Sequence, residues 1–380
     1  MSHRAAAPDV RISRLETRVD GRQHRVSAEV DGVSVWFDSL DLPLRASGEA
    51  FGSAFLIPAL IARRRIVIEA PVCPIWLTHQ AGLVELFHRW WRLPRLAPQA
   101  SPATVARVRS AKTGLCFSGG VDSFHTLLRG GRPVDWLVTA QGFDMSWQDS
   151  VRIAGVRRSL EAIASRTGAR PVVVRTNLRD HPLVSRAEWE RAHGGALASL
   201  GHLLDESLGT LLVSSSIQIG SHTEAWGSHW RSDPLWSSSR LQVIHCGAEV
   251  RRRQKLEAIA GEELVQQHLR VCWENLAPQG NCSRCEKCVV TMLILSELGL
   301  LNRFAVFEHD DALAARVDAL PRMRQRRRSF FEASRSTLLA PEIQRAVREL
   351  VERTRSAESL TDRARRLAGR MLARVRGRAS

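Results

Sequence analysis

The chain has 380 residues, of which 44% are hydrophobic and 25% are charged, a balance typical of soluble globular proteins. Its length predicts two or three domains of roughly 150 residues each. No uncharged apolar stretch approaches the ~18 residues of a membrane span, and residues 1–10 lack the apolar core of a secretory signal. We therefore expect a cytoplasmic protein with no membrane partner.

Basic residues exceed acidic ones, with 55 Lys and Arg against 39 Asp and Glu, and the formal net charge is +16. More than half of this excess lies in residues 301–380, where 19 arginines and 10 acidic residues leave +9. A basic region of this kind suits a polyanion, so RNA is a candidate partner. Because only three of the basic residues are lysines, the excess of arginine is also compatible with a coding bias.

The N-terminal region alternates polar and apolar residues in short runs, such as Arg25–Val30 and Val33–Phe37. The pair Asp31-Gly32 separates these two runs, which is typical of a β-hairpin. From Pro74 to Leu93 the apolar residues instead follow the period of an amphipathic helix. We expect a β-rich N-terminal domain over residues 1–105 that ends in this helix.

Residues 106–300 repeat a pattern of strand, turn and helix, which predicts an α/β domain with a parallel sheet. The candidate buried strands are Gly114–Phe117, Trp136–Ala140, Pro171–Thr176, Thr210–Ser214 and Leu241–His245. Ligands of such sheets bind at the carboxyl ends of the strands. Residues 301–380 are arginine-rich and predict a helical C-terminal region.

The most informative segment follows the first of these strands and reads Ser-Gly-Gly-Val-Asp-Ser, residues 118–123. Two glycines let a backbone approach an anion closely, and the first amides and the dipole of the following helix attract negative charge. The hydroxyls of Ser118 and Ser123 add hydrogen-bond donors, and Asp122 caps the helix or helps to hold Mg²⁺. An ordinary turn with a good N-cap is the alternative, but the fully specified sequence favours phosphate binding.

Four of the seven cysteines lie close together, as C-x9-C-x2-C-x2-C, at Cys272, Cys282, Cys285 and Cys288. Four thiolates at this spacing predict a closed tetrahedral Zn²⁺ site with a structural role, because no ligand position is left for water. An iron–sulfur cluster also suits four cysteines. Free buried thiols or two disulfides are less compatible with a cytoplasmic chain that is otherwise poor in cysteine.

The first of these motifs resembles the PP-loop of the N-type ATP pyrophosphatases, and the two together resemble 7-cyano-7-deazaguanine synthase (QueC) and its relatives. The resemblance covers roughly residues 110–298. It implies a HUP-like (adenine nucleotide alpha hydrolase) fold that binds ATP, Mg²⁺ and zinc. The implied ATP-binding residues are Ser118, Gly119, Gly120, Val121, Asp122 and Ser123, with catalytic roles for Ser118, Asp122 and Ser123.

Members of the resembled family adenylate a carboxylate with release of pyrophosphate, and ammonia then displaces AMP. The resemblance therefore implies an ATP-dependent ligase that forms a C–N bond. The family's Tyr-Pro-Asp-Cys-Arg stretch has no clear equivalent, since the nearest segment reads Ser232-Asp233-Pro234-Leu235-Trp236. The acceptor is thus an unidentified carboxylate on a small molecule or a protein, attacked by ammonia or another amine.

Two other functions remain open. One is a PP-loop sulfur transferase that modifies tRNA, for which the basic C-terminal region is suited. The other is a nucleotide-binding interaction module without catalysis.

Several weaker signals lie near the expected nucleotide site. The loop after Ser214, up to residue 240, is polar and aromatic and forms either a substrate lid or a layer packed over the domain. Lys255 either contacts phosphate or lies on a solvated helix face. The family resemblance implies that adenine and ribose rest near Thr139–Gly142 and Thr176–Asn177.

Overall fold

The computed structural model describes residues 8–105, 108–220, 225–277, 280–310, 312–321 and 337–355. The chain divides into two compact units, Met1–Ile259 and Ala260–Ser380, and each is described by itself. These two units do not coincide with the three domains expected over residues 1–105, 106–300 and 301–380. One sheet continues from the first of these ranges into the second, and the four-cysteine segment groups with the C-terminal helices.

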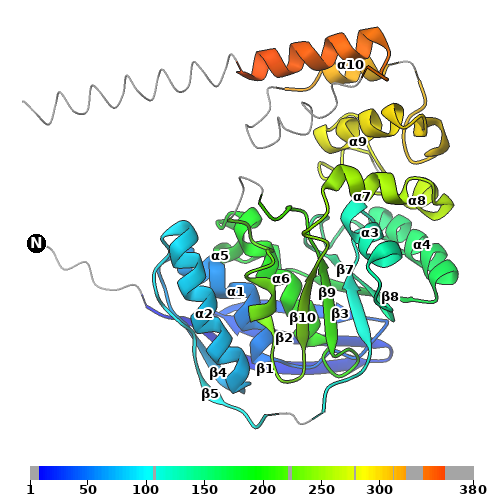
Figure 1. Cartoon of the computed structure of the whole chain (residues 1–380). Coiled ribbons are helices and arrows are strands. Elements are labelled where there is room, and N and C mark those ends of the chain that lie inside the picture. The colour runs from blue at the N-terminus through cyan, green and yellow to red at the C-terminus, as the bar shows by residue number, and fades with distance from the viewer. Residues whose placement is uncertain are drawn as a thin grey trace, which may run out of the picture. The chain divides into compact units, whose positions relative to one another are not determined.

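The first unit contains a ten-stranded sheet that is mostly parallel, which confirms the predicted α/β class (Figure 1). In their order across the sheet, the strands are β10 (Gln242–Cys246), β9 (Thr210–Ser214), β6 (Thr113–Cys116), β7 (Trp136–Gln141), β8 (Arg170–Thr176), β3 (Val33–Ser39), β2 (Gln23–Val30), β1 (Val10–Asp20), β4 (Ile66–Val72) and β5 (Gln99–Pro102). Strands β10 to β8 run parallel to one another, so their carboxyl ends share one edge of the sheet.

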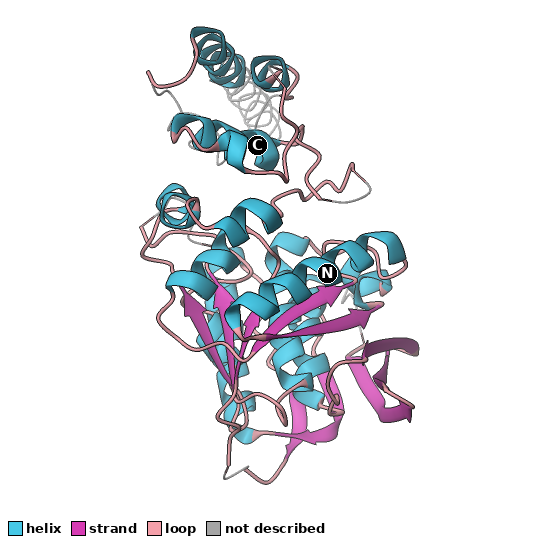
Figure 2. Cartoon of the chain, turned by 90° about the vertical axis from the view of Figure 1, so that its right-hand side faces the viewer, coloured by secondary structure: helices cyan, strands magenta, loops and turns pink. Residues whose placement is uncertain are grey.

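Helices pack on both faces of the parallel strands (Figure 2). The helices of this unit are α1 (Gly48–Ile61), α2 (Pro74–Trp91), α3 (Val121–Arg129), α4 (Ser150–Thr167), α5 (Pro182–Ser185), α6 (Trp189–Leu203) and α7 (Arg252–Ile259). The start of α3 lies shortly after β6, as the sequence predicts for the segment over residues 118–123. Among the described residues, no helix has both the length and the apolar composition needed to cross a membrane.

The N-terminal strands extend the same sheet. Asp31 and Gly32 have φ values of +51° and +76°, as a two-residue hairpin turn between β2 and β3 requires. Strand β3 then pairs antiparallel with β8, with Phe37 opposite Thr176. Arg157 of α4 also binds the carboxylate of Asp41, which lies just after β3. These contacts join the region before residue 105 to the parallel strands.

Helix α1 is the main element that the sequence analysis missed. It is buried on nearly every side and packs against α6, where the backbone of Gly195 lies against that of Ser53. A helix that is apolar all round has no amphipathic stripe by which a periodicity search would find it.

The second unit is helical in its described part. It contains α8 (Glu263–His268), α9 (Glu286–Glu297), the short 3-10 helix η3 (Leu301–Arg303), α10 (Leu313–Asp318) and a further helix over 341–355. The predicted helical C-terminal region is thus observed in this part. Much of the arginine-rich sequence, at 322–336 and 356–380, lies outside the described residues.

Candidate functional site

The loop between β6 and α3 carries the Ser118–Ser123 segment. Gly119 has a φ of +74°, which a side chain would strain, and Gly120 is the N-cap residue of α3. Ser118 Oγ accepts a hydrogen bond from the amide of Gly120 (3.3 Å), and Ser123 Oγ donates to the carbonyl of Gly120 (3.0 Å). None of the described side chains caps α3. The amides of its first turn and its dipole can therefore act on an anion.

Asp122, in this first turn, binds two cationic side chains from α7. Lys255 Nζ lies 3.1 Å from Asp122 Oδ1, and Arg252 donates to Oδ2 of the same carboxylate. Lys255 also donates to the carbonyl oxygen of Ser215 (2.6 Å) and is only 2% exposed. The interpretation that Lys255 lies on a solvated helix face is therefore wrong.

Two cations and one carboxylate leave a net positive charge beside the loop. The sequence analysis did not connect Arg252 with this site, although Arg252 is close to Lys255 in the sequence. The rarity of lysine in the chain was the one signal that singled out Lys255. Its contact with Asp122 was not visible, because the two residues are 133 positions apart.

His125 and Gly247 lie next to Lys255. A Cβ atom on Gly247, whose φ is +75°, would stand 3.4 Å from Lys255 Nζ, so this backbone approaches the ammonium group closely. Burial, and then the charge of Lys255, lower the pKa of His125. His125 Nδ1 is buried and has no hydrogen-bond partner among the described residues. A neutral imidazole with an unused nitrogen thus lies beside the cationic group.

The segment after β9 is tied to α3. Ser214 Oγ donates to Thr126 Oγ1 (2.8 Å), and Ser215 Oγ donates to the carbonyl of Ile217 (2.5 Å). The loop then continues through residues 221–224, which lie outside the described part of the chain and include Glu224. Its later part packs over the domain, since Asp233 and Trp236 are both almost fully buried.

The two segments expected to hold adenine and ribose differ in the structure. Thr139, near the end of β7, donates to the carbonyl of Phe117 (2.7 Å), directly before the Ser118–Ser123 loop. Thr176 and Asn177, at the end of β8, are instead hydrogen-bonded to the backbone of Trp36 in β3, at 2.7 and 2.8 Å. The end of β8 is therefore engaged by the N-terminal strands.

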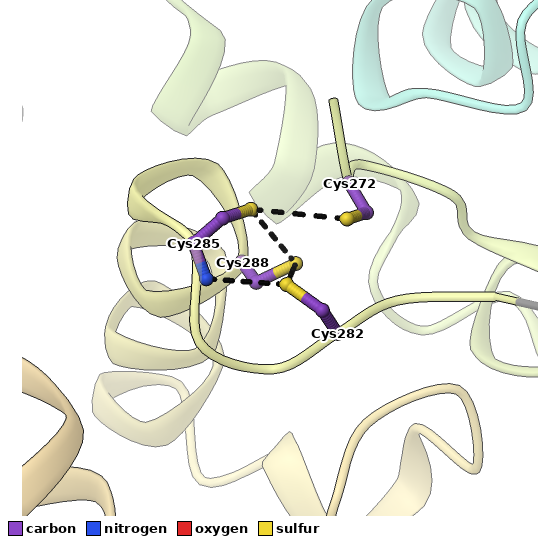
Figure 3. A group of neighbouring side chains, drawn as sticks. All are labelled: Cys272, Cys282, Cys285 and Cys288. Carbon is purple, nitrogen blue, oxygen red and sulfur yellow. Dashed lines mark hydrogen bonds between the residues drawn. The ribbon is translucent and has the colours of Figure 1, made fainter. Parts of the chain in front are cut away.

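The second unit brings the four cysteines of the motif together (Figure 3). All four side chains are buried, and their sulfur atoms lie within 4.8 Å of one another. The separations include 3.4 Å from Cys285 to Cys288 and 3.9 Å from Cys282 to Cys288. Four sulfurs around one Zn²⁺ at about 2.3 Å stand roughly 3.8 Å apart. The group can therefore hold a metal ion of this size.

Local structure fixes the positions of these sulfurs. Cys285 is the N-cap residue of α9, and its amide donates to Cys282 Sγ (3.2 Å), while Cys288 lies in the first turn of the helix. Asn281 holds the remaining arm, because its side-chain oxygen accepts from the amides of Val271 and Cys272 at 2.8 and 3.1 Å. The cysteine spacing gave no sign of this role of Asn281.

The acidity of the thiols follows from their proximity. The hydrogen bond with Cys288 lowers the pKa of Cys285 to about 5, and the same contact raises the pKa of Cys288. Cys285 therefore loses its proton readily, and the negative charge of its thiolate opposes the loss of the proton of Cys288. A cation at the centre would remove this opposition, so metal binding must displace protons from the cluster.

Comparison of the chain with family models, with curated proteins and with solved structures gives no match.

Proposed function

We propose that this protein is an ATP-dependent adenylating enzyme of the QueC-like, PP-loop group with a HUP-like nucleotide-binding domain. It would activate a carboxylate with release of pyrophosphate, and ammonia or another amine would then displace AMP. The observation that carries the proposal is the uncapped start of α3 behind Gly119 and Gly120, with the buried Lys255 held beside it. A buried ammonium group next to an anion-binding turn is suited to a polyphosphate.

Phosphate contacts would come from the amides of Gly120 and the first turn of α3, and from the hydroxyls of Ser118 and Ser123. As the bond between the α and β phosphates breaks, negative charge accumulates on the departing pyrophosphate. Lys255 and Arg252 supply fixed positive charge close to that group. Interactions that strengthen as charge develops are the ones that accelerate the step, and positioning of the carboxylate supplies much of the rest.

Asp122 has a positioning role in this proposal. Its carboxylate binds both cations of α7, and it therefore holds Lys255 toward the loop. Mg²⁺, when bound with ATP, would screen the phosphate charges. The residues able to contribute to its surroundings are Asp122 and the two serines.

The four-cysteine group would hold zinc as a structural ion. Four thiolates close its coordination shell, so no position remains for water or substrate. The sulfur distances fit a tetrahedral ion, and Asn281 orders the surrounding backbone. Zinc would therefore stabilise the second unit rather than take part in adenylation.

Sulfur transfer to tRNA is less well supported. Cys116 and Cys246, the last residues of β6 and β10 in the first unit, have pKa values raised chiefly by burial. Such thiols are poor nucleophiles and poor sulfur carriers. Cys282→Ser tests the alternative, because we expect it to lose metal and destabilise the second unit. A folded, metal-loaded but inactive variant would support sulfur transfer instead.

The proposal is tested by exchange of labelled pyrophosphate into ATP. The probe is 7-carboxy-7-deazaguanine, whose carboxyl carbon becomes the nitrile carbon in the family reaction. We expect exchange that depends on this carboxylate, and a decrease of about 10²-fold in Ser118→Ala. Ser165→Ala, which removes a hydroxyl from the exposed face of α4, is the control and should exchange normally. Absence of exchange in the unmodified protein would refute the proposal for this acceptor.

A further inference from the structure

A buried aspartate–histidine pair lies in the first unit, outside the contacts described so far. Asp233 begins the short 3-10 helix η2 (Asp233–Trp236), and His245 lies near the carboxyl end of β10. Asp233 Oδ2 is 2.7 Å from His245 Nδ1, and the two side chains are only 2% and 3% exposed. Both side chains are thus largely buried.

The hydrogen bonds around Asp233 fix the form of the imidazole. Asp233 accepts from the hydroxyl of Ser228 (2.7 Å) and from the amide of His229 (3.1 Å). A carboxylate that receives these bonds accepts from His245 Nδ1 as well, so the proton of the neutral ring lies on Nδ1. The lone pair then lies on Nε2, for which the described residues provide no hydrogen bond.

The sheet register brings this nitrogen to the level of the phosphate-binding loop. His245 is level with Val213 of β9, and Leu115 of β6 is level with the preceding residue of β9. Cys116, the last residue of β6, is therefore level with His245 and lies two strands away, a separation of ~10 Å. Burial and, second, the charge of Asp233 raise the pKa of Cys116, which agrees with this proximity.

The pair and the loop approach this edge from opposite faces of the sheet. Ser214 of β9 is hydrogen-bonded to α3, so its neighbour Val213 points to the other face. His245 shares that other face, where η2 packs against β10. A substrate held above the ends of β6 and β9 would have the phosphates toward α3 and the imidazole on its opposite side.

Burial affects the other titratable groups near Asp233. Burial lowers the pKa of His229 to about 4 and also lowers the pKa of His193. Burial raises the pKa values of the thiols of Cys116 and Cys246. Among the described residues around Asp233, His245 is the one that has a carboxylate on one ring nitrogen and no hydrogen bond on the other.

Packing alone does not explain the pair. Buried charged and polar pairs contribute little net stability compared with apolar residues of similar volume. The same constellation of a carboxylate on Nδ1 and a bare Nε2 is what a general base requires.

We propose that His245 is the general base that accepts the proton of the attacking amine, and that Asp233 is its positioning residue. The inference rests on the proposed function. The amine nitrogen forms a bond to the activated carboxyl carbon, the bond from that carbon to the AMP oxygen breaks, and AMP leaves with the electron pair. The nitrogen gives its proton to His245 Nε2, which later releases it to water.

The test separates adenylation from amine attack in the full-length protein. His245→Gln and Asp233→Asn are compared with His88→Gln. This control removes an imidazole on α2 whose Nδ1 lies 2.7 Å from the carbonyl oxygen of Leu93. The probe is 7-carboxy-7-deazaguanine with ATP. Pyrophosphate exchange reports adenylation, and product is measured with either ammonia or hydroxylamine, which is already unprotonated and strongly nucleophilic at neutral pH.

We expect His245→Gln to keep pyrophosphate exchange within about twofold, but to use ammonia ~10²-fold more slowly. Its rate with hydroxylamine should stay near that of the control, since that nucleophile needs less help from a base. Asp233→Asn should show the same selective decrease in kcat with ammonia, with KM for ATP unchanged.

Unchanged use of ammonia by His245→Gln would overturn the inference. A parallel loss of exchange and of both amine reactions would also overturn it, because the pair would then be structural. Failure of the proposed function has a different signature, the absence of exchange in the unmodified protein and in His88→Gln.

Discussion

Replacement of Lys255 by methionine tests the proposed nucleotide site most directly. The side chain is 2% exposed and makes two contacts, 3.1 Å to Asp122 and 2.6 Å to the carbonyl of Ser215. Methionine keeps most of the volume but removes the charge and both contacts. Asp122 keeps its bond to Arg252, so no carboxylate is left without a cation.

The magnitudes for stability and for activity differ. Loss of a donor to the buried carbonyl of Ser215 costs about 1–3 kcal/mol in the free energy of unfolding. The cost of 3–5 kcal/mol that is typical of an orphaned buried charge does not apply, because Arg252 remains. Removal of one charged group from the departing pyrophosphate should decrease the exchange rate by ~10²-fold. Activity should therefore fall far more than stability.

Lys112→Met is the matched control, since Lys112 also pairs with an aspartate, Asp135, at 2.7 Å. It lies at the opposite, amino end of β6 and is 56% exposed. An exposed pair contributes only about 0–1 kcal/mol, so both stability and exchange should change little. Denaturant unfolding and pyrophosphate exchange are measured for both variants. Exchange by Lys255→Met at the rate of Lys112→Met would refute the role given to Lys255.

The other two predictions concern stability. Asn281→Ala removes three hydrogen bonds to the backbone of Leu269, Val271 and Cys272 and a fourth to the carbonyl of Val306. We therefore expect weaker retention of the proposed zinc in chelator competition and a loss of about 3 kcal/mol in the free energy of unfolding. Unchanged retention would show that the cysteines alone order the site. For Asp38, burial alone would raise the pKa, but hydrogen bonds from Arg175 and Arg25 outweigh it and lower the pKa. The stabilisation from Asp38 should therefore be present above about pH 4 and decline as the pH falls further. In denaturant unfolding, Asp38→Asn should be less stable at neutral pH, and its stability should decline less steeply toward acid pH. An identical pH profile in the variant and the unmodified protein would contradict this.

The parallel half of the sheet was predictable because its strands are short apolar runs followed by turn residues and helices. Thr210–Ser214 begins and ends as predicted, and the other four strands differ by one residue at one or both ends. The turn at Gly119 and the start of α3 were also predictable, since local chain geometry requires glycine there. The clustering of the cysteines followed from their spacing within one short segment.

Contacts between distant segments were not predictable in this way. The burial of Lys255 depends on Asp122 and Ser215, which lie in other βα units, and a basic sequence around it suggested solvent instead. Asp233 follows a long loop and His245 lies in a strand, and the two side chains pair in the structure. The pattern of polar and apolar residues in that strand gives no sign of a polar partner. Such contacts depend on which strands become neighbours, and a single sequence does not determine that order.

The N-terminal strands limit where a nucleotide can lie. Asn177, at the end of β8, accepts from the amide of Trp36 and donates to the carbonyl of Ser34. A Cβ atom on Gly142, whose φ is +115°, would lie 2.0 Å from the carbonyl oxygen of Thr176, so the end of β7 also crosses close to β8. Backbone of β3 on one side and backbone at Gly142 on the other thus occupy the space at the end of β8. In the proposed function, a base bound at this edge would rest over β6 and β7, and the N-terminal region would form one border of the proposed nucleotide site.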